Sequence, residues 1–446
     1  MSPDLDPTET LVREQLRREL DAVEVPPTPG VFRSAAQGSP VTRRVLVGAA
    51  AASALGVAVA GSQWARRPSG TPAPPAGAAA GGAARVGSWR TLAPLPLSPR
   101  SGMHGLRVGQ RALFLGGSLA LPCPPTASCL APTQWPTDGA IFDPAVGTWR
   151  TFTYPGAETS ASAPVPVGDR AVFASGTAWL AVSAATGEVA ALPAWTGAEP
   201  LPPLTSDGRR VYAVRQSDEV SATVNSDGAP DVATATAGRV RVLDLSSGAW
   251  SELPADPLGP SFDRSLIWCD SGLVVLAKKL VASPGGADGP ALVRAAVFAD
   301  GAWRRLPDLD CIGGWSWRWT GRRLVSPLLG GADGGETNGY GRTIAFHAWL
   351  DPVTGQSGPL PDAPASEAIT QWVDGPADKN FMVVQGWLYD DDAGTWTRLT
   401  RPGGGQWIDS AGVLLDRQLI VAGGYDQADD YRSEAGLTAA AWQLKF

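Results

Sequence analysis

The side chains that most often carry catalysis are scarce in this sequence. It contains two histidines, His104 and His347, and four cysteines, none of which form a CxxC pair. A zinc or copper centre needs several imidazole or thiolate ligands, and no Ser-His-Asp arrangement is visible. The sequence therefore favours a protein without catalytic residues, bound metal or cofactor over an enzyme.

Aromatic and acidic side chains gather instead in Gly-rich segments between apolar runs. These segments cover residues 117–138, 215–238, 278–290, 331–341 and 424–436. Aromatic faces stack on the C–H patches of sugars, and carboxylates hydrogen-bond the hydroxyl groups. The mixture therefore predicts a ligand-binding surface suited to glycans. The alternative, that acidic Gly-rich segments are only soluble loops, stays open.

A repeated element positions these segments. Each copy has an apolar strand, a small or acidic residue, a Gly-containing turn and a Trp on the next strand. The clearest copies are IFDPAVGTWRTF (141–152), VLDLSSGAWSEL (242–253), VFADGAWRRL (297–306) and LYDDDAGTWTRL (388–399). Because Trp149, Trp250, Trp303 and Trp396 occupy one repeat position, we expect them to pack between repeats.

The spacing of the repeats predicts an all-β fold, a propeller. From one turn to the next, about 40 to 60 residues pass, which is the length of a four-stranded blade. Residues 87–446 then hold about seven blades. The isolated strand SWRTL (88–92) is expected to join the final strand AAAWQLKF (439–446) and so close the ring.

The doubled glycines that end several apolar runs, together with the FDPxxGxW turn, resemble the kelch repeat. The nearest copy is PLSPRSGMHGLRVGQRALFLGGS. Kelch propellers include that of galactose oxidase, so the resemblance implies a β-propeller over residues 87–446. Galactose oxidase-like copper chemistry needs two imidazoles, two tyrosinates and a thiol. Here His104 and His347 fall in different blades and no Tyr or Cys matches, so no metal site carries over.

Strand direction divides the loops of a propeller between two faces. With the strands labelled a to d outward from the axis, the b–c and d–a loops share one face, and the a–b and c–d turns share the other. The long Gly-rich segments are b–c loops, so we expect the ligand on that face. The residues predicted to contact it are Trp315, Tyr340, Tyr425, Glu336, Asp426 and Arg100.

The cysteines suggest an oxidising compartment. Cys123 and Cys129 lie in CPPTASC within the longest blade-one loop, where the prolines restrict the chain. We therefore predict a disulfide between them. Pairing of Cys269 with Cys311 stays open.

The residues before the propeller fall into three segments. Residues 1–42 are predicted to be cytoplasmic and to contain an amphipathic helix between Pro7 and Pro26. Residues 43–64 hold the uncharged run from Val45 to Ala60, which is barely long enough to cross a hydrocarbon core of about 30 Å. Residues 65–86 form a linker of Pro, Ala and Gly.

These three segments resemble the amino-terminal parts of single-pass actinobacterial proteins that look like anti-sigma factors. The resemblance implies a cell-membrane location with the propeller extracytoplasmic. A second interpretation competes with it. Thr42-Arg43-Arg44-Val45-Leu46 also resembles a twin-arginine export signal, and Ala58-Val59-Ala60 resembles a signal-peptidase site. The long region before the arginines favours an uncleaved transmembrane helix.

Charge excludes one class of partner. The formal net charge is −7 and no long run of Lys or Arg is present. The sequence therefore predicts no basic surface that could bind the phosphates of a nucleic acid. The sequence predicts a membrane-tethered extracytoplasmic propeller that binds a glycan or an envelope protein. The alternative is a secreted carbohydrate-active enzyme on the same scaffold, which two carboxylates about 5 to 10 Å apart would favour.

Overall fold

The structure is a computed structural model. It describes residues 86–120, 135–156, 161–194, 203–224, 230–280, 291–313, 317–326, 332–334, 343–361, 374–384, 386–404, 407–426 and 436–446. The expected amino-terminal helix and apolar segment lie outside these residues. Within the described ranges, no helix is long and apolar enough to cross a membrane. The short 3-10 turns there are η1 (Asp218–Ser221), η2 (Val232–Thr234) and η4 (Pro402–Gly404).

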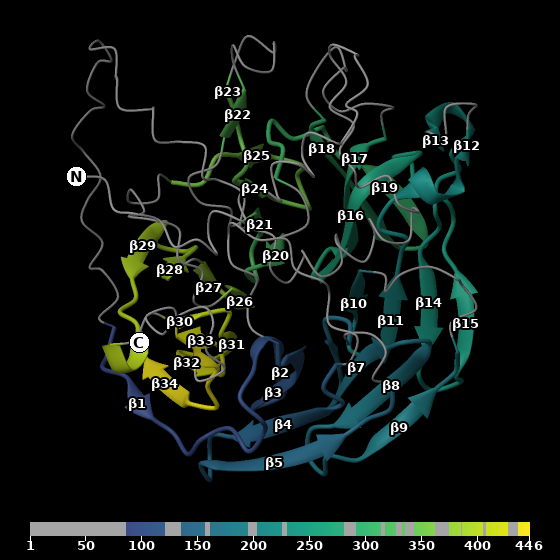
Figure 1. The fold of residues 1–446 in the computed structure, drawn as a ribbon. Coiled ribbons are helices and arrows are strands. Elements are labelled where there is room, and N and C mark those ends of the chain that lie inside the picture. The colour runs from purple at the N-terminus through teal and green to yellow at the C-terminus, as the bar shows by residue number, and fades with distance from the viewer. Residues whose placement is uncertain are drawn as a thin grey trace, which may run out of the picture. The chain divides into compact units, whose positions relative to one another are not determined.

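Seven four-stranded antiparallel sheets make up the described fold. Figure 1 shows how they are arranged in space. Blade 1 contains β2 (Ser101–Val108), β3 (Arg111–Ser118), β4 (Asp138–Asp143) and β5 (Thr148–Thr153). Blade 2 contains β6 (Val165–Val167), β7 (Arg170–Ser175), β8 (Ala178–Ser183) and β9 (Val189–Leu192). Blade 3 contains β10 (Leu204–Ser206), β11 (Arg210–Ala213), β14 (Arg241–Asp244) and β15 (Ala249–Glu252). Blade 4 contains β16 (Ser261–Cys269), β17 (Gly272–Lys279), β18 (Val293–Ala299) and β19 (Ala302–Arg305).

The remaining blades follow the same order. Blade 5 contains β20 (Arg318–Trp319), β21 (Leu324–Ser326), β24 (Ala348–Leu350) and β25 (Ser357–Gly358). Blade 6 contains β26 (Asp374–Asp378), β27 (Phe381–Val384), β28 (Trp387–Asp390) and β29 (Thr395–Arg398). Blade 7 contains β31 (Ala411–Leu415), β32 (Gln418–Ala422), β34 (Ala441–Lys445) and β1 (Arg90–Thr91). Three two-stranded ladders add β12 (Thr223–Val224) with β13 (Pro230–Asp231), β22 (Ala332–Gly334) with β23 (Thr343–Ala345), and β30 (Trp407–Ile408) with β33 (Tyr425–Asp426).

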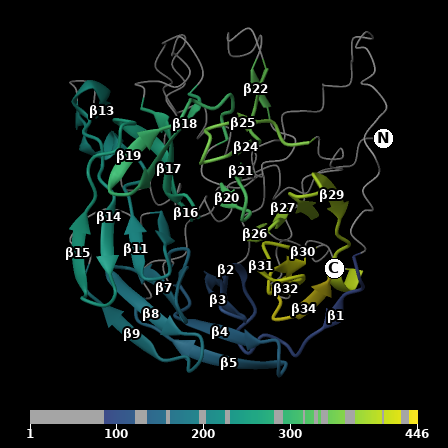
Figure 2. The same cartoon turned by 180° about the vertical axis from the view of Figure 1, so that it is seen from behind.

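The inner strands form a closed ring. In chain order, β2, β6, β10, β16, β20, β26 and β31 each contact the next, and β31 contacts β2. Figure 2 shows the same ring from behind. The predicted β-propeller is therefore confirmed, with seven blades.

The ring closes through the strand that comes first in the chain. β1 pairs with β34 antiparallel, with Arg90 opposite Gln443 and Thr91 opposite Trp442. Backbone hydrogen bonds from Gly87 N to Lys445 O, at 2.9 Å, extend this ladder. The outer strand of blade 7 thus comes from the beginning of the propeller, as the sequence predicted.

Strand position within a blade sets its residue pattern. The second strand is covered on both faces by neighbouring blades, so it is apolar at consecutive positions, as in Leu113-Phe114-Leu115, all with 0% exposure. The outermost strand, by contrast, is largely exposed. The glycines that end inner strands allow close backbone approach. At Gly424, which has a φ of +108°, a Cβ would lie 2.3 Å from Ser410 Oγ.

In five of the seven blades, a Trp on or next to the outer strand joins the blade to the preceding one. Its indole N–H donates a hydrogen bond to a backbone carbonyl in the segment where the preceding blade ends. The pairs are Trp149 with Ala93, Trp250 with Pro193, Trp303 with Pro254, Trp396 with Pro361, and Trp89 with Thr400. Packing of these Trp residues between repeats is thereby confirmed.

Candidate functional site

The two faces of the propeller differ in the length of their connections. On one face, the a–b and c–d turns are tight, such as Gly109-Gln110 between β2 and β3. On the other face, long b–c connections link β3 to β4, β11 to β14, β17 to β18, β21 to β24 and β32 to β34. We call the face formed by the b–c and d–a connections the long-loop rim. Among the strands that the structure describes, the b–c connections of blades 2 and 6 are tight.

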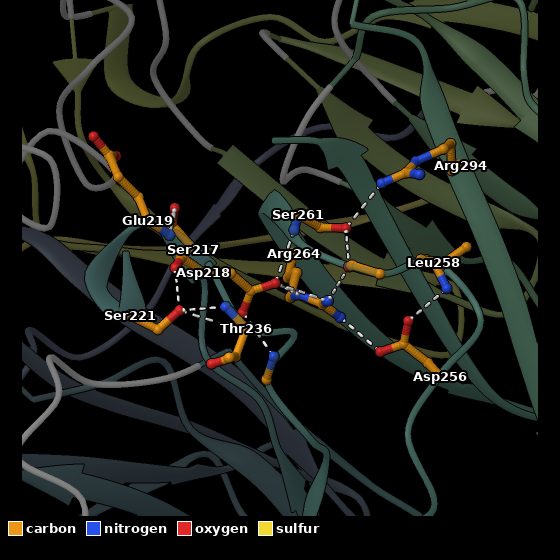
Figure 3. Close-up of polar contacts among 12 residues, drawn as sticks. Ser217, Asp218, Glu219, Ser221, Thr236, Asp256, Leu258, Ser261, Arg264 and Arg294 are labelled. Atoms are coloured by element: carbon orange, nitrogen blue, oxygen red, sulfur yellow. Dashed lines mark hydrogen bonds and ion pairs between the residues drawn. The ribbon is translucent and has the colours of Figure 1, made fainter. Parts of the chain in front are cut away.

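A buried ion-pair network holds two of these connections against blade 4. Arg264 of β16 lies between Asp218, from the b–c connection of blade 3, and Asp256, from the connection that enters blade 4 (Figure 3). Arg264 Nη2 lies 3.0 Å from Asp218 Oδ2, and Nη1 lies 2.8 Å from Asp256 Oδ2. The three side chains are 0%, 0% and 1% exposed. We call them the Arg264 cluster.

Backbone donors satisfy the remaining carboxylate oxygens of the Arg264 cluster. Asp218 Oδ1 accepts from Gly238 N at 2.8 Å and Oδ2 accepts from Ser261 N at 2.8 Å. Asp256 Oδ1 accepts from Leu258 N at 2.9 Å. A buried charge that is paired and fully hydrogen-bonded has a structural role more often than a catalytic one. The cluster therefore positions the rim and offers no free acid or base.

A β-bulge turns Arg264 toward its partners. The register of β16 against β17 breaks between Phe262 and Ser265, which leaves two residues opposite one. Asp263, inside the bulge, has a φ of 51°. Its carboxylate pairs with Lys278 Nζ at 3.1 Å, and the two side chains are 21% and 14% exposed. The bulge thus places a second, less buried ion pair beside the Arg264 cluster.

A second polar cluster lies on the rim of blade 1. Arg100, 1% exposed, binds Asp138 through two hydrogen bonds of 2.6 and 3.2 Å. Tyr154 lies beside them and donates its hydroxyl hydrogen to Pro136 O at 3.0 Å. Burial, and then the Asp138 charge, raise the pKa of Tyr154 to about 12. This tyrosine therefore stays protonated and acts as a hydrogen-bond donor.

The structure describes three of the six residues predicted to bind the ligand. Arg100 is buried and engaged by Asp138. Asp426 is partly buried in β33, opposite Trp407. Tyr425 is 0% exposed, and its ring lies against Gly436, where a Cβ would be 2.2 Å from the ring. Trp315, Tyr340 and Glu336 lie outside the described residues, as do Cys123 and Cys129.

The expectation that Tyr425 is an exposed loop side chain was wrong. The loop that contains it pairs with the connection entering blade 7, through the ladder of β30 and β33, and the buried ring lies against Gly436. Contact of Tyr425 with a ligand stays a prediction, and it would require the ring to be uncovered. Trp317, two residues after Trp315, is 1% exposed in the core between blades 4 and 5.

The described cysteines and histidines form no reactive group. Cys269 and Cys311 are free and buried, and burial raises the pKa of Cys311 to about 12. His104 lies in β2 of blade 1, whereas His347 precedes β24 of blade 5. Within the described ranges, no group of three His, Cys, Asp or Glu side chains is placed to hold a metal ion.

A small hollow occurs at the opposite face. It has a volume of about 130 Å³ and lies at the c–d turn of blade 1, where Arg111, Asp143 and Arg150 line it. Its charged groups already have partners, because Arg111 pairs with Asp143 at 2.9 Å and Arg150 donates to Ala185 O at 2.6 Å. The hollow therefore offers little to a ligand, and the long-loop rim remains the candidate site.

Comparison with models of protein families and with curated proteins found no match for this chain. Kelch membership therefore stays a resemblance of the repeats. The functional residues that sequence reasoning missed are those of the Arg264 cluster. One signal could have found it, since an Arg in the middle of the inner-strand segment SFDRSLIW must have a charged partner if that strand is buried.

Proposed function

We propose that this protein is a single-pass membrane protein whose extracytoplasmic propeller binds a glycan of the cell envelope on the long-loop rim. An envelope protein is the alternative ligand. The proposal makes residues 43–64 the membrane anchor and residues 65–86 the spacer that carries the propeller away from the bilayer.

One observation supports the binding role above the others. The long connections lie on one face, and a buried ion-pair network at the base of that face joins one of them, through Asp218, to Arg264 of the inner strand of blade 4. Maintaining buried charge is costly unless it is fully paired. A scaffold that needed loops only as linkers would gain nothing from anchoring them in this way. Functional loops on a rigid scaffold have this arrangement.

The binding role is tested with the detergent-solubilised full chain on an array of envelope glycans. The double variant Tyr340→Ala/Glu336→Gln, on the rim, should lose binding while keeping the thermal midpoint of the wild type. The matched control is Val146→Ser, at an exposed c–d turn of the opposite face, where the side chain is 69% exposed. Equal loss in both variants, or none in the rim variant, would move the site elsewhere. Capture of one envelope protein without glycan binding would select the alternative ligand.

The membrane role has its own measurement. Fractionation should leave the chain in the membrane, and protease added outside the cell should digest the linker and release the propeller. Sequencing of the mature amino terminus would detect the contrary outcome, which is cleavage of the segment. A soluble product that begins at Gly61 would show cleavage after Ala60 and support the twin-arginine export signal instead.

A further inference from the structure

Three arginines gather on the face of blade 4 that packs against blade 3. Ala296 of β18 belongs to the core between these blades, and Arg294, two residues earlier on the same strand, shares its face. Arg305 of β19 lies opposite Ala296 and also shares this face. Arg264 reaches the same region from β16. All three lie at the end of the blade where the long-loop rim begins.

The described carboxylates in this region are already engaged. Arg264 binds both Asp218 and Asp256, and neither carboxylate is exposed beyond 1%. Asp308 pairs with Arg305 at 2.9 Å. In the described part of the chain, no carboxylate lies within ion-pair distance of Arg294. Three carboxylates thus form ion pairs with Arg264 and Arg305, and none of them pairs with Arg294.

Arg294 instead meets a neutral acceptor (Figure 3). Its Nη2 donates to Ser261 Oγ at 3.0 Å, and Ser261 in turn donates to Gly259 O at 2.8 Å. The Nε atom is buried and has no hydrogen-bond partner. Burial, followed by the neighbouring Arg305 charge, lowers the pKa of Arg294 from its usual value. A guanidinium nevertheless stays charged at neutral pH.

We propose that Arg294 binds an anionic group of the ligand, the carboxylate of an acidic sugar, at the junction of blades 3 and 4. This inference rests on the proposed glycan-binding function and specifies its substrate class. A guanidinium suits a carboxylate because hydrogen bonds between two charged groups are shorter and stronger than neutral ones. The partly desolvated setting strengthens the attraction relative to bulk water.

The charge of the chain favours an acidic sugar over an acidic polypeptide. The net charge of −7 includes carboxylates of the b–c segments such as Asp333 and Asp430. A run of acidic residues would be repelled by a protein of this charge. An acidic sugar surrounds its carboxylate with neutral hydroxyl groups, so at this subsite one carboxylate meets one cation.

The test uses the full chain in detergent and two polymers, polygalacturonate and the same polymer after its carboxyl groups have been reduced. Wild type should bind the acidic polymer at least tenfold more tightly than the reduced one, which corresponds to about 1.4 kcal/mol. The preference should shrink as salt is raised. Arg294→Gln should remove the preference, and Arg294→Lys should restore part of it.

Arg305→Gln is the matched control, because Arg305 lies beside the proposed subsite but is 47% exposed and already paired. It should leave the preference within about twofold of wild type. If Arg294→Gln fails to fold, the wild-type thermal midpoint provides a second readout. Sodium glucuronate should raise it, and glucose at equal ionic strength should not.

The possible outcomes distinguish the anion subsite at Arg294 from the proposed glycan-binding function on which it rests. Equal binding of both polymers, or an unchanged preference in Arg294→Gln, would overturn the anion subsite and leave glycan binding intact. Absence of binding to every glycan would overturn both. Binding of poly-glutamate in preference to polygalacturonate, lost in Arg294→Gln, would replace the sugar with an acidic polypeptide and overturn the proposal as stated.

Discussion

Each face of this propeller has an arginine that bridges two aspartates from other segments, but the two bridges differ in burial. On the long-loop rim, Arg264 and its partners Asp218 and Asp256 are 0% to 1% exposed. On the turn face, Arg107 of β2 binds Asp378 of blade 6 and Asp416 of blade 7, with the three side chains 25%, 12% and 47% exposed. Lys379 adds a further contact to Asp416 at 3.0 Å.

The difference indicates that two bridges built from the same residue types contribute unequally to the stability of the fold. The Arg107 bridge connects a–b turns that are short and already fixed by their own strands, and its side chains stay partly exposed. The rim bridge positions connections that leave the sheets for many residues, and there the charges are sealed from water. Removing one partner of a buried pair is costly because the other charge stays behind, whereas exposed pairs contribute little.

The largest effect is expected from Arg264→Leu. The substitution leaves two buried carboxylates without their cation, and it should lower the free energy of unfolding by about 3 to 5 kcal/mol. Urea unfolding followed by tryptophan fluorescence measures it. The triple variant Arg264→Leu/Asp218→Asn/Asp256→Asn removes the charges together and should recover a large part of the loss. A single variant as stable as wild type would show that the cluster is not a structural anchor.

Trp250→Ala should have an intermediate effect that is independent of both bridges. Trp250 donates to Pro193 O at 3.3 Å and packs edge-to-face on Trp179, with ring centroids 5.3 Å apart. Because the indole is only partly buried, we expect a loss of about 2 to 3 kcal/mol, below that of a fully buried Trp. Trp250→Phe keeps the ring contact and should lose about 1 kcal/mol. Thermal unfolding of both variants checks the order.

Arg107→Gln tests the partly exposed bridge on the turn face. The Arg107–Asp378 pair is partly exposed, so its loss should lower the free energy of unfolding by only about 0.2 to 1 kcal/mol. The effect should fade in about 1 M salt, where the screening length is near 3 Å. The Arg264→Leu effect should persist there. Equal salt dependence of the two variants would contradict the assignment of one bridge to the interior.

The smallest expected effect is on pH dependence and involves His104, on the same inner strand as Arg107. Burial lowers the pKa of His104 below 6.5, although a hydrogen bond to Ala161 O, at 3.1 Å, opposes the shift. The unfolded chain therefore binds a proton more readily than the folded one, and stability should fall as pH drops below about 6.5. Thermal midpoints between pH 7.5 and 5 should show this fall in wild type and less of it in His104→Gln.

The repeated turn made the fold predictable because its chemistry is local. In the copy at residues 143–149, Asp143 accepts a hydrogen bond from Ala145 N at 3.0 Å, and Gly147 has a φ of +71°. The Trp that follows reaches the preceding blade. These requirements fall within a few residues, so they leave a pattern in the sequence. Blade number and ring closure followed from counting that pattern.

The site residues were less predictable because their contacts join distant segments. Asp218 and Arg264 are 46 positions apart and meet only because a bulge turns the arginine. Tyr425 lies in a Gly-rich loop, which suggested exposure, yet its side chain is 0% exposed and its ring lies against Gly436. Neither event has a local signature. The repeat pattern placed the long connections on one face, as the strand order confirms, but it did not predict the exposure of individual side chains there.

The closing strand also has a consequence for protein synthesis. Among the described strands, β1 is synthesised first and its partner β34 last. The nascent propeller therefore keeps unpaired strand edges until residues 441–446 emerge, and it is open to faulty association during that time. A premature stop that removes only residues 441–446 would delete the third strand of blade 7 and deprive β1 of its partner. The six codons for residues 441–446 thus decide whether the strands described before them can close into a ring.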